Sequence, residues 1–236
     1  MDSIFDGLNE KQVEAVKAIH GPVLVVSGPG SGKTRCLTHR IAYLLSQGVD
    51  PESILAVTFT NKAAGEIRHR VGALVKVERT RQPTIGTFHA LGLRILRAHI
   101  DRLGYSRSFT IMDMGDQHTL LRRIVADLGL DAKRYSPGAM SSYISRCKTE
   151  LSEPSAVKPP SGYERAAASV YELYQERLSS MNAVDFGDLV MLSVKLLTQY
   201  PEITAQYRAQ WQYVLVDEYQ DTSRDQYRFM RLLADG

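Results

Sequence analysis

The feature that most constrains the fold is a glycine-rich loop between an apolar run and a segment with helical spacing. The loop reads SGPGSGKT over residues 27–34, and the run before it reads VLVV over residues 23–26. After the loop, Leu37, Ile41 and Leu44 recur at the spacing of one helix face. A strand, a glycine-rich loop and a helix in this order form a Walker A phosphate-binding loop. The pattern therefore predicts a buried strand over 23–26, a helix over 33–45 and an α/β fold.

The residue types in the loop are those that phosphate binding requires. Glycines let backbone N–H groups turn inward around phosphate oxygens, and a helix N-terminus adds partial positive charge. Lys33 is expected to reach the β- and γ-phosphates, and the Thr34 hydroxyl to ligate Mg²⁺. The expected cradle consists of Gly28, Gly30, Ser31 and Gly32. Ser27 stands where the regular pattern has glycine, and the alternative is a glycine-rich turn with a chance GKT.

An acidic pair follows a second apolar run near the end of the sequence. Residues 214–218 read VLVDE, so Asp217 and Glu218 are expected where a strand ends. Beside a Walker A loop, the first carboxylate holds Mg²⁺, directly or through water, and the second can deprotonate an attacking water. Most such pairs are simply charged strand ends. Paired with the loop, they predict a nucleoside triphosphate hydrolysis site with Lys33, Asp217 and Glu218 as catalytic residues.

Strands and helices alternate along the first hundred residues, and this alternation is then interrupted. The further predicted strands cover 54–59, 84–87 and 213–216. The further predicted helices cover 61–75, 91–103, 116–128, 166–178, 185–197 and 225–233. Short strand–helix connections imply a parallel sheet flanked by helices. We therefore predict a P-loop ATPase domain split into residues 1–103 and 185–236, with a helical subdomain inserted over 104–184.

Composition excludes several classes of protein. With 236 residues, 44% of them hydrophobic and 23% charged, the chain is neither disordered nor fibrous. No apolar run is long enough to span a bilayer, and the acidic N-terminus has no signal-peptide pattern. The two cysteines have no metal-ligand spacing, which favours a reducing cytoplasm.

The net charge of +3 is too small to indicate nucleic-acid binding, but the basic residues are unevenly distributed. Between residues 62 and 107 only Glu66, Glu78 and Asp101 are acidic. The basic residues of this segment are Lys62, Arg68, Arg70, Lys76, Arg79, Arg81, Arg94, Arg97, Arg102 and Arg107. The segment is a candidate electrostatic footprint for a nucleic acid, and the alternative is a set of solvated helix faces.

Five motifs in order resemble those of superfamily 1 DNA helicases of the UvrD/PcrA/Rep type. They are LNEKQVEAV at 8–16, SGPGSGKTR at 27–35, TFTNKAA at 58–64, GTFHALGLRIL at 86–96 and VDEYQDTS at 216–223. That family usually has alanine or serine at the position of Ser27. The long gap between residues 100 and 200 is similar to its inserted helical subdomain. The resemblance covers essentially the whole chain and implies a RecA-like fold.

The resemblance implies roles for residues outside the phosphate loop. Gln12 matches a glutamine that reads the adenine edge, and Arg35 an arginine that lies along the adenine face. The implied single-stranded DNA contacts are Phe59, Thr60, Asn61, Lys62, Thr87 and His89. Aromatic stacking and helix N-termini suit bases and phosphates respectively. The alternatives are a solvent-facing helix residue for Gln12, a core residue for Phe59 and a cap or packing residue for His89.

The implied function is that of an ATP-dependent 3′–5′ DNA helicase that translocates on single-stranded DNA, with ATP and Mg²⁺ as cofactors. Expected partners are single-stranded DNA, duplex junctions and repair or replication proteins, with no membrane, in a bacterial-type, nucleoid-associated cytoplasmic setting. The family's later motifs and its C-terminal motor domain are missing from the 236 residues. We therefore expect a fragment that binds ATP–Mg²⁺ and unwinds nothing alone. The alternatives are a non-catalytic nucleotide- or DNA-binding module that regulates a partner, and the helicase half of a nuclease–helicase complex.

Overall fold

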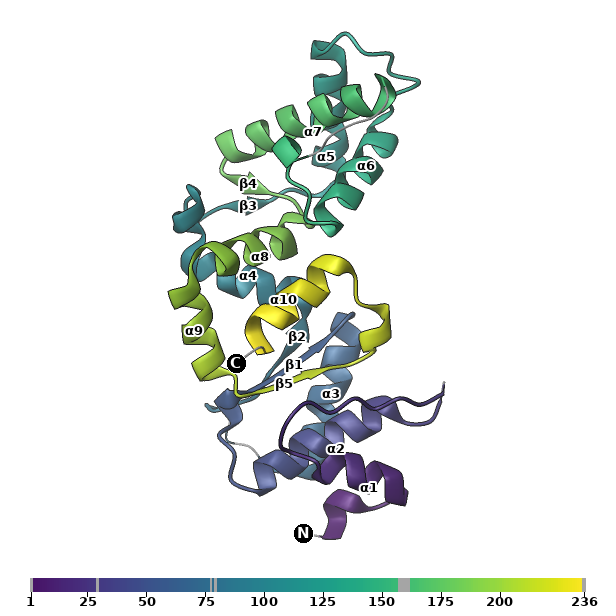
Figure 1. The fold of residues 1–236 in the computed structure, drawn as a ribbon, viewed down its shortest axis with the longest axis vertical. Helices are drawn as coiled ribbons and strands as arrows, with labels where there is room; N and C mark the ends of the chain where they lie inside the picture. Colours follow the sequence, from purple (N-terminus) through teal and green to yellow (C-terminus); the bar gives the residue numbers. More distant parts are fainter. Residues whose placement is uncertain (1, 29, 77, 79, 157–161, 235–236) are drawn as a thin grey trace. The chain divides into compact units, whose positions relative to one another are not determined.

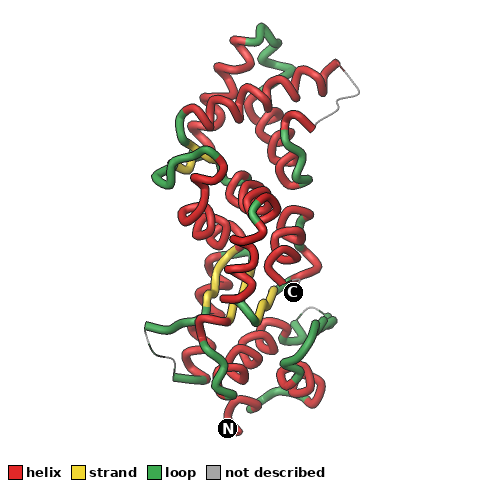
Figure 2. Tube along the Cα trace, turned by 60° about the vertical axis from the view of Figure 1, so that its left-hand side comes forward, coloured by secondary structure: helices red, strands yellow, loops and turns green. Residues whose placement is uncertain are grey.

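The structure is a computed structural model that describes residues 2–28, 30–76, 78, 80–156 and 162–234. Pro29 of the glycine-rich loop and Arg79 of the basic segment lie outside the described residues. The chain forms two compact units. We call Met1–Phe88, Glu202–Thr222 and Leu233–Gly236 the sheet unit, and His89–Pro201 with Ser223–Leu232 the helical unit. Helices make up most of the chain in Figure 2, and strands a small part.

The sheet unit is built on three parallel strands in the order β2-β1-β5. Its strands are β1 (Ile54–Thr58), β2 (Thr84–Thr87) and β5 (Tyr213–Val216). Its helices are α1 (Glu10–Lys17), α2 (Lys33–Ser46), α3 (Asn61–Leu74) and α9 (Pro201–Gln210, whose first residue belongs to the helical unit). Short 3₁₀ turns cover Asp2–Phe5, Pro51–Ser53 and Tyr219–Asp221. Thr58 pairs with Thr87, and Val57 with Val216, so the three strands end at one edge of the sheet.

One hydrophobic core joins the sheet to α2 and α3 (Figure 1). Every residue of the central strand β1 is buried, as expected for a parallel strand covered on both faces. The core is formed by Leu37, Ile41, Leu44, Ile54, Ala56, Ala64, Ile67, Val71, Ile85 and Leu215. The predicted α/β class is confirmed, as are the strands at 84–87 and 213–216 and the helix from Lys33.

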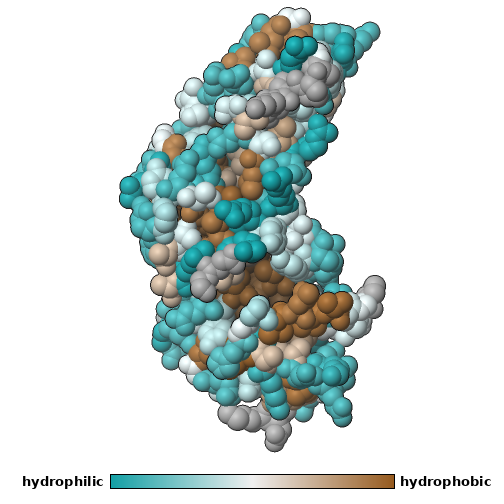
Figure 3. Space-filling model, in the orientation of Figure 1, coloured by the Kyte–Doolittle hydropathy of each residue, from teal (hydrophilic) through white to brown (hydrophobic). Residues whose placement is uncertain are grey.

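The predicted buried strand over 23–26 is wrong. Val23, Leu24, Val25 and Val26 are 41%, 72%, 42% and 85% exposed and are not part of a strand. A strand needs a hydrogen-bonding neighbour, and the described part of the sheet has β1 as the only partner of β5. This segment therefore runs through solvent without a partner, although its side chains are apolar. Figure 3 shows a brown hydrophobic area over the sheet unit.

The helical unit contains most of the remaining helices. They are α4 (Phe88–His99, whose first residue belongs to the sheet unit), α5 (Met114–Asp127), α6 (Pro137–Thr149), α7 (Gly162–Ser180), α8 (Asp188–Gln199) and α10 (Arg224–Ala234, whose last two residues belong to the sheet unit). Two short strands, β3 (Thr110–Ile111) and β4 (Ala183–Val184), pair in parallel, and 3₁₀ turns cover Ile100–Leu103 and Pro154–Ala156. Its core lies between α5, α6 and α7, around residues such as Ile124, Met140 and Tyr171.

The helical unit differs from the predicted insertion in its elements and extent. Helix α6 is absent from the predicted elements, although Ser136 caps it and Pro137 occupies its first turn. The β3–β4 pair was also not predicted. The unit includes residues 89–103 and 185–201, which the sequence analysis assigns to the ATPase domain. Compact units need not coincide with an inserted subdomain, and the boundaries at 103/104 and 184/185 remain a prediction.

Two further observations concern the chain as described. Trp211, the single tryptophan, is 1% exposed in the sheet unit and stacks on Tyr207 with ring centroids 5.0 Å apart. None of the helices in the described part of the chain combines the length and the apolar character that crossing a membrane requires.

Candidate functional site

The glycine-rich loop leads directly into the first turn of α2. Gly30 and Gly32 adopt positive φ angles of 73° and 89°, in the left-handed region that glycine accepts without strain. Gly32 is the N-cap residue of α2 and has no side chain to occupy the free N–H groups of the first turn. Ser31 closes the loop, since its hydroxyl donates to the Gly28 carbonyl oxygen at 2.6 Å. The loop therefore keeps unsatisfied N–H donors at a helix N-terminus, which suits an anion.

Lys33 extends over the same loop. Its Nζ atom donates to the carbonyl oxygens of Ser27 and Gly28 at 3.4 and 3.5 Å, and it lies 3.9 Å from a carboxylate oxygen of Glu218. These distances are long for charge-assisted hydrogen bonds, which are usually below 3 Å. The ammonium group is thus held only loosely, and its side chain keeps 22% of its surface exposed. It is free to bind phosphate oxygens.

Thr34 and Asp217 meet although they are far apart in the sequence. The Thr34 hydroxyl donates to the two Asp217 carboxylate oxygens at 3.1 and 3.4 Å. Asp217 follows the last residue of β5, and its backbone N–H donates to the Val57 carbonyl oxygen, which fixes it to the central strand. Asp217 is only 5% exposed, and this burial raises the pKa of its carboxyl group above the ordinary value.

This pair fits the requirements of Mg²⁺. A hydroxyl and a carboxylate are the hard oxygen ligands that Mg²⁺ selects, and it usually keeps water and phosphate oxygens as the others. Desolvation of Asp217 by burial is a cost that a cation beside the carboxylate would offset. Thr34 and Asp217 are therefore the residues that would hold the ion.

Glu218 has an unusual backbone. Its φ and ψ angles are 51° and 44°, and only Leu151 and Asn182 share a positive φ among the described non-glycine residues. This conformation is unfavourable for a side chain with a Cβ atom and is concentrated at functional sites. The Glu218 side chain is 40% exposed, and one of its carboxylate oxygens lies 3.9 Å from Lys33 Nζ.

Gln12 and Arg35 lie beside the loop. Gln12 Nε2 donates to the Ser31 carbonyl oxygen at 2.9 Å, and Gln12 Oε1 accepts from the Asn9 backbone N–H at 2.9 Å. Arg35 donates to the Asp6 carbonyl oxygen at 3.1 Å. Both side chains are thus adjacent to the cradle, with hydrogen-bonding partners inside the protein. Their roles toward adenine remain predictions.

Five of the six predicted DNA contacts lie in the sheet unit, where the strands end. Phe59 follows β1, and its ring packs against that of Phe88 at 5.4 Å between centroids. Thr60 caps α3 by accepting from the Ala63 backbone N–H at 3.1 Å, and Asn61 and Lys62 are exposed in its first turn. Thr87 ends β2 and is buried. The structure therefore brings these residues to the sheet edge at which Asp217 lies.

His89 lies in the helical unit and contacts a residue that the sequence did not single out. Its ring stacks on Phe186, with centroids 3.8 Å apart and an interplanar angle of 17°. Phe186 is 56% exposed, and burial lowers the pKa of His89, which favours a neutral ring. Phe186 lies in the turn DFGD over 185–188, at the start of the predicted helix 185–197, whereas α8 begins only at Asp188. Phe186 belongs to none of the five motifs.

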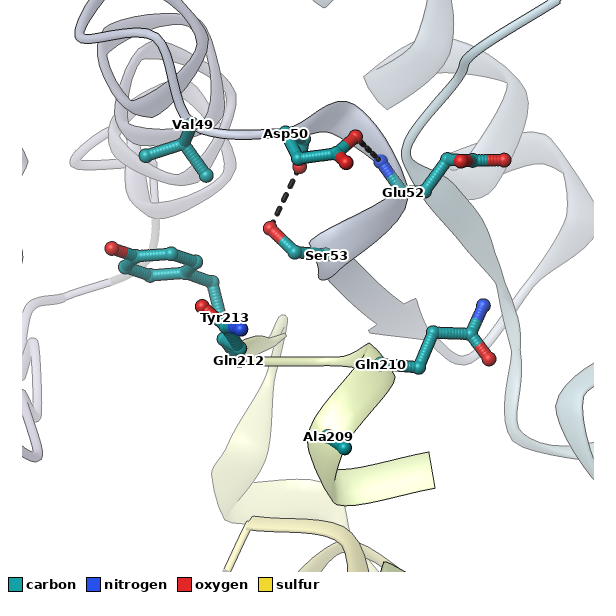
Figure 4. Close-up of a pocket in the computed structure, with 8 residues that line it drawn as sticks. All are labelled: Val49, Asp50, Glu52, Ser53, Ala209, Gln210, Gln212 and Tyr213. Carbon is teal, nitrogen blue, oxygen red and sulfur yellow. Dashed lines mark hydrogen bonds between the residues drawn. The ribbon is translucent and has the colours of Figure 1, made fainter. Parts of the chain in front are cut away.

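A polar pocket lies at the other end of the strands. It has a volume of about 520 Å³ and is lined by residues just before β1, such as Asp50 and Ser53, and by residues before and at the start of β5, such as Tyr213 (Figure 4). The Ser53 hydroxyl donates to the Asp50 carbonyl oxygen at 2.7 Å. Ligands of parallel α/β sheets bind beyond the carboxyl ends of the strands. We therefore assign the functional site to the loop and Asp217 rather than to this pocket.

Comparisons with known proteins identify the family of the chain. The family model of the UvrD/REP helicase N-terminal domain matches residues 8–236. The chain is 43% identical over 237 residues to the ATP-dependent DNA helicase PcrA of Leuconostoc citreum, a match that covers 99% of this chain and 32% of that relative. The helicases of the same name from Bacillus subtilis (strain 168) and Staphylococcus aureus (strain Mu50) have the same identity and coverage. The chain thus spans about a third of the length of these relatives. Since the family model spans nearly the whole sequence, this chain belongs to the UvrD/REP helicase N-terminal domain family.

Proposed function

We propose that this chain is the N-terminal ATP-binding portion of an ATP-dependent 3′–5′ DNA helicase that translocates on single-stranded DNA. The observation that carries the proposal is the contact between Thr34 at the start of α2 and Asp217 at the end of β5. It brings a helix N-terminus, a lysine and two carboxylates to one place. The names of the PcrA relatives and the family model support the same conclusion.

In this proposal the chain's residues divide the work of ATP hydrolysis. The backbone of the loop and Lys33 bind the phosphates, and Gln12 and Arg35 lie beside the adenine. Thr34 and Asp217 hold Mg²⁺, which when bound neutralises charge on the phosphates. Glu218 orients a water molecule and accepts its proton, because it is the exposed carboxylate next to Lys33.

DNA binding is assigned to two sets of residues. In the sheet unit, Phe59, Thr60, Asn61, Lys62 and Thr87 offer an aromatic ring, a helix N-terminus and positive charge. In the helical unit, the stacked rings of His89 and Phe186 present an exposed aromatic face to an unpaired base. We expect the same surfaces to engage strands next to duplex junctions. We further propose that the helicase to which this chain belongs contacts repair or replication proteins on the bacterial nucleoid.

Binding of a fluorescent ATP analogue with Mg²⁺ tests the phosphate site. A hydrogen bond to a charged group contributes about 1.5–3 kcal/mol, so Lys33→Ala should weaken binding by about 10- to 150-fold. Lys11→Ala is the matched control, since that side chain is 90% exposed on α1 and should bind as the unaltered chain does. Equal affinity of Lys33→Ala and the unaltered chain would contradict the site.

ATP turnover separates the helicase fragment from a non-catalytic module that regulates a partner. We expect slow turnover without strand separation, and its complete loss in Glu218→Gln. A regulatory module would bind ATP and single-stranded DNA with no turnover that depends on Glu218. Strand separation by the 236 residues alone would contradict the view that the second motor domain is required.

A further inference from the structure

A buried group of charges lies in the helical unit, whereas the glycine-rich loop and Asp217 belong to the sheet unit. Lys148 on α6 is 1% exposed, and Asp185 and Asp188 are 5% and 0% exposed. Lys148 Nζ lies 2.7 Å from Asp185 Oδ2 and 2.8 Å from Asp188 Oδ1, so one ammonium group joins both carboxylates. Tyr174 donates to Asp185 at 3.0 Å, and Gln175 donates to Asp188 at 3.2 Å.

The two carboxylates also close the turn 185–188 from both ends. The Asp185 backbone N–H donates to Asp188 Oδ2 at 3.0 Å, and the Asp188 backbone N–H donates to Asp185 Oδ1 at 2.9 Å. A Cβ atom on Gly187 would lie 3.1 Å from Lys148 Cδ, so the lysine stem packs directly beneath the turn. Each of the four carboxylate oxygens therefore accepts a hydrogen bond either from a backbone N–H of the turn or from Lys148.

The turn carries Phe186, the exposed ring that stacks on His89. Helices α4 and α8 approach each other closely at this point, because a Cβ atom on Gly92 would lie 2.3 Å from the Leu189 carbonyl oxygen. The Ser193 hydroxyl donates to the Leu189 and Gly92 carbonyl oxygens at 2.7 and 3.3 Å. His89 is thus fixed from α4, and Phe186 is fixed from the turn that precedes α8.

We infer that Lys148 is a positioning residue for DNA binding: through Asp185 and Asp188 it fixes the turn that presents Phe186, stacked on His89, to an unpaired base. The inference rests on the proposed function, in which this aromatic face contacts single-stranded DNA. A buried ion pair contributes little net stability compared with a hydrophobic replacement of similar volume. Its geometric effect is specific, because Lys148 is the one cation in contact with both ends of the turn among the described residues.

A double-mutant cycle on oligothymidylate binding tests this role. Base–aromatic stacking predicts that Phe186→Ala weakens binding by about 5- to 150-fold. Lys148→Met should lose a similar factor, and the double variant Lys148→Met/Phe186→Ala should be no weaker than Phe186→Ala alone. Lys195→Met is the control, since this partly exposed lysine of α8 pairs with Glu153. ATP-analogue affinity should be unchanged in all four variants.

The outcomes separate the two proposals. Normal DNA binding by Phe186→Ala would contradict the proposed base contact and the role of Lys148 together. Weak binding by Phe186→Ala with normal binding by Lys148→Met would overturn only the role of Lys148. Independent losses that multiply in the double variant would also overturn it, because they would indicate a general structural role.

A second variant covers the case in which Lys148→Met does not fold. The triple variant Lys148→Met/Asp185→Asn/Asp188→Asn removes all three buried charges and leaves oxygens to accept the turn's backbone hydrogen bonds. It lacks the ammonium group that joins the two ends of the turn. We expect it to fold and to bind oligothymidylate more weakly than the unaltered chain, and unaltered affinity would overturn the inference.

Discussion

The two units each place a lysine near carboxylates that follow a strand, with opposite results. In the sheet unit, Lys33 lies 3.9 Å from Glu218, and both side chains keep part of their surface exposed. In the helical unit, Lys148 lies 2.7 Å from Asp185, which directly follows β4, and both are almost completely buried. The first group is open and loosely paired, and the second is closed and fully paired.

This difference shows how a charged group that binds a ligand can be distinguished from one that stabilises the local backbone. A charged group whose partners are all inside the protein has nothing to offer a ligand, but it can hold backbone in place. A charged group with long, partial contacts beside free N–H donors is ready to bind an anion. Residue types alone do not distinguish the two, since both groups contain a lysine and two acids.

The largest expected effect is on stability. Removing one partner of a buried pair leaves an uncompensated charge and costs about 3–5 kcal/mol, so Lys148→Met should lower the free energy of unfolding by that amount. Lys33→Met is the matched change in the open site and should stay within about 0.5 kcal/mol. Urea denaturation measures both. Equal losses in the two variants would break the comparison.

Glycine-to-alanine substitutions on one helix of each unit are expected to change stability by a smaller amount. Gly92→Ala on α4 would drive a Cβ atom against backbone, and overpacking of this kind typically costs about 1–3 kcal/mol. Gly72→Ala on α3 meets nothing within 4 Å and should stabilise the chain by about 0.5–1 kcal/mol. Thermal unfolding of both variants gives the comparison. A stabilised Gly92→Ala would show that α4 and α8 do not meet as described.

The last expected effect is a gain in stability when a buried charge of the open site is removed. Burial raises the pKa of Asp217 above its ordinary value of 3.8, so its carboxyl binds a proton more readily in the folded chain than in the unfolded one. The charged carboxylate is therefore less favourable in the folded chain than in the unfolded one. The free energy of unfolding falls as the pH rises from 3.8 through the raised pKa of the folded chain. Asp217→Asn should stabilise the ligand-free chain at pH 7 by about 0.5–2 kcal/mol while removing the Mg²⁺ dependence of ATP binding.

The control for Asp217→Asn is the pH dependence of the stability that the substitution adds. The gain from Asp217→Asn should shrink as the pH falls toward 3.8, because the carboxyl of the unaltered chain is then protonated. Denaturation at a series of pH values measures this. A gain that is the same at pH 4 and pH 7 would exclude the burial of the charge as its cause.

Local sequence patterns predict three strands and two helices of the sheet unit, but they miss α1 and α9 and wrongly predict a strand over 23–26. Strands β1, β2 and β5 have short apolar runs bounded by polar residues, and all three were predicted. The run VLVV at 23–26 has the same composition, but a strand depends on a neighbour, which composition does not supply. Helix α6 has a start signal that was overlooked, since Ser136 caps it and Pro137 occupies its first position.

The site followed from sequence only where residues are close in the chain or belong to a motif. The loop and the VDE segment each predict their own chemistry, although the Thr34–Asp217 contact spans 183 positions. Lys148 and Asp185 are 37 positions apart and belong to no phosphate or metal pattern, so no sequence rule joins them. Phe186 belongs to no motif, and only its exposure and its stacking on His89 distinguish it from other aromatic residues.

The position of Trp211 has a practical consequence for all these measurements. It is the one fluorescent indole of the sequence, buried against Tyr207 within the sheet unit. Its emission therefore follows the unfolding of the sheet unit, whereas far-ultraviolet circular dichroism records helices of both units. Different midpoints for the two signals would show that the units melt separately. The chain thus carries its own fluorescent reporter for the sheet unit, to which we assign the ATP site, and this reporter does not follow the helical unit that contains Lys148.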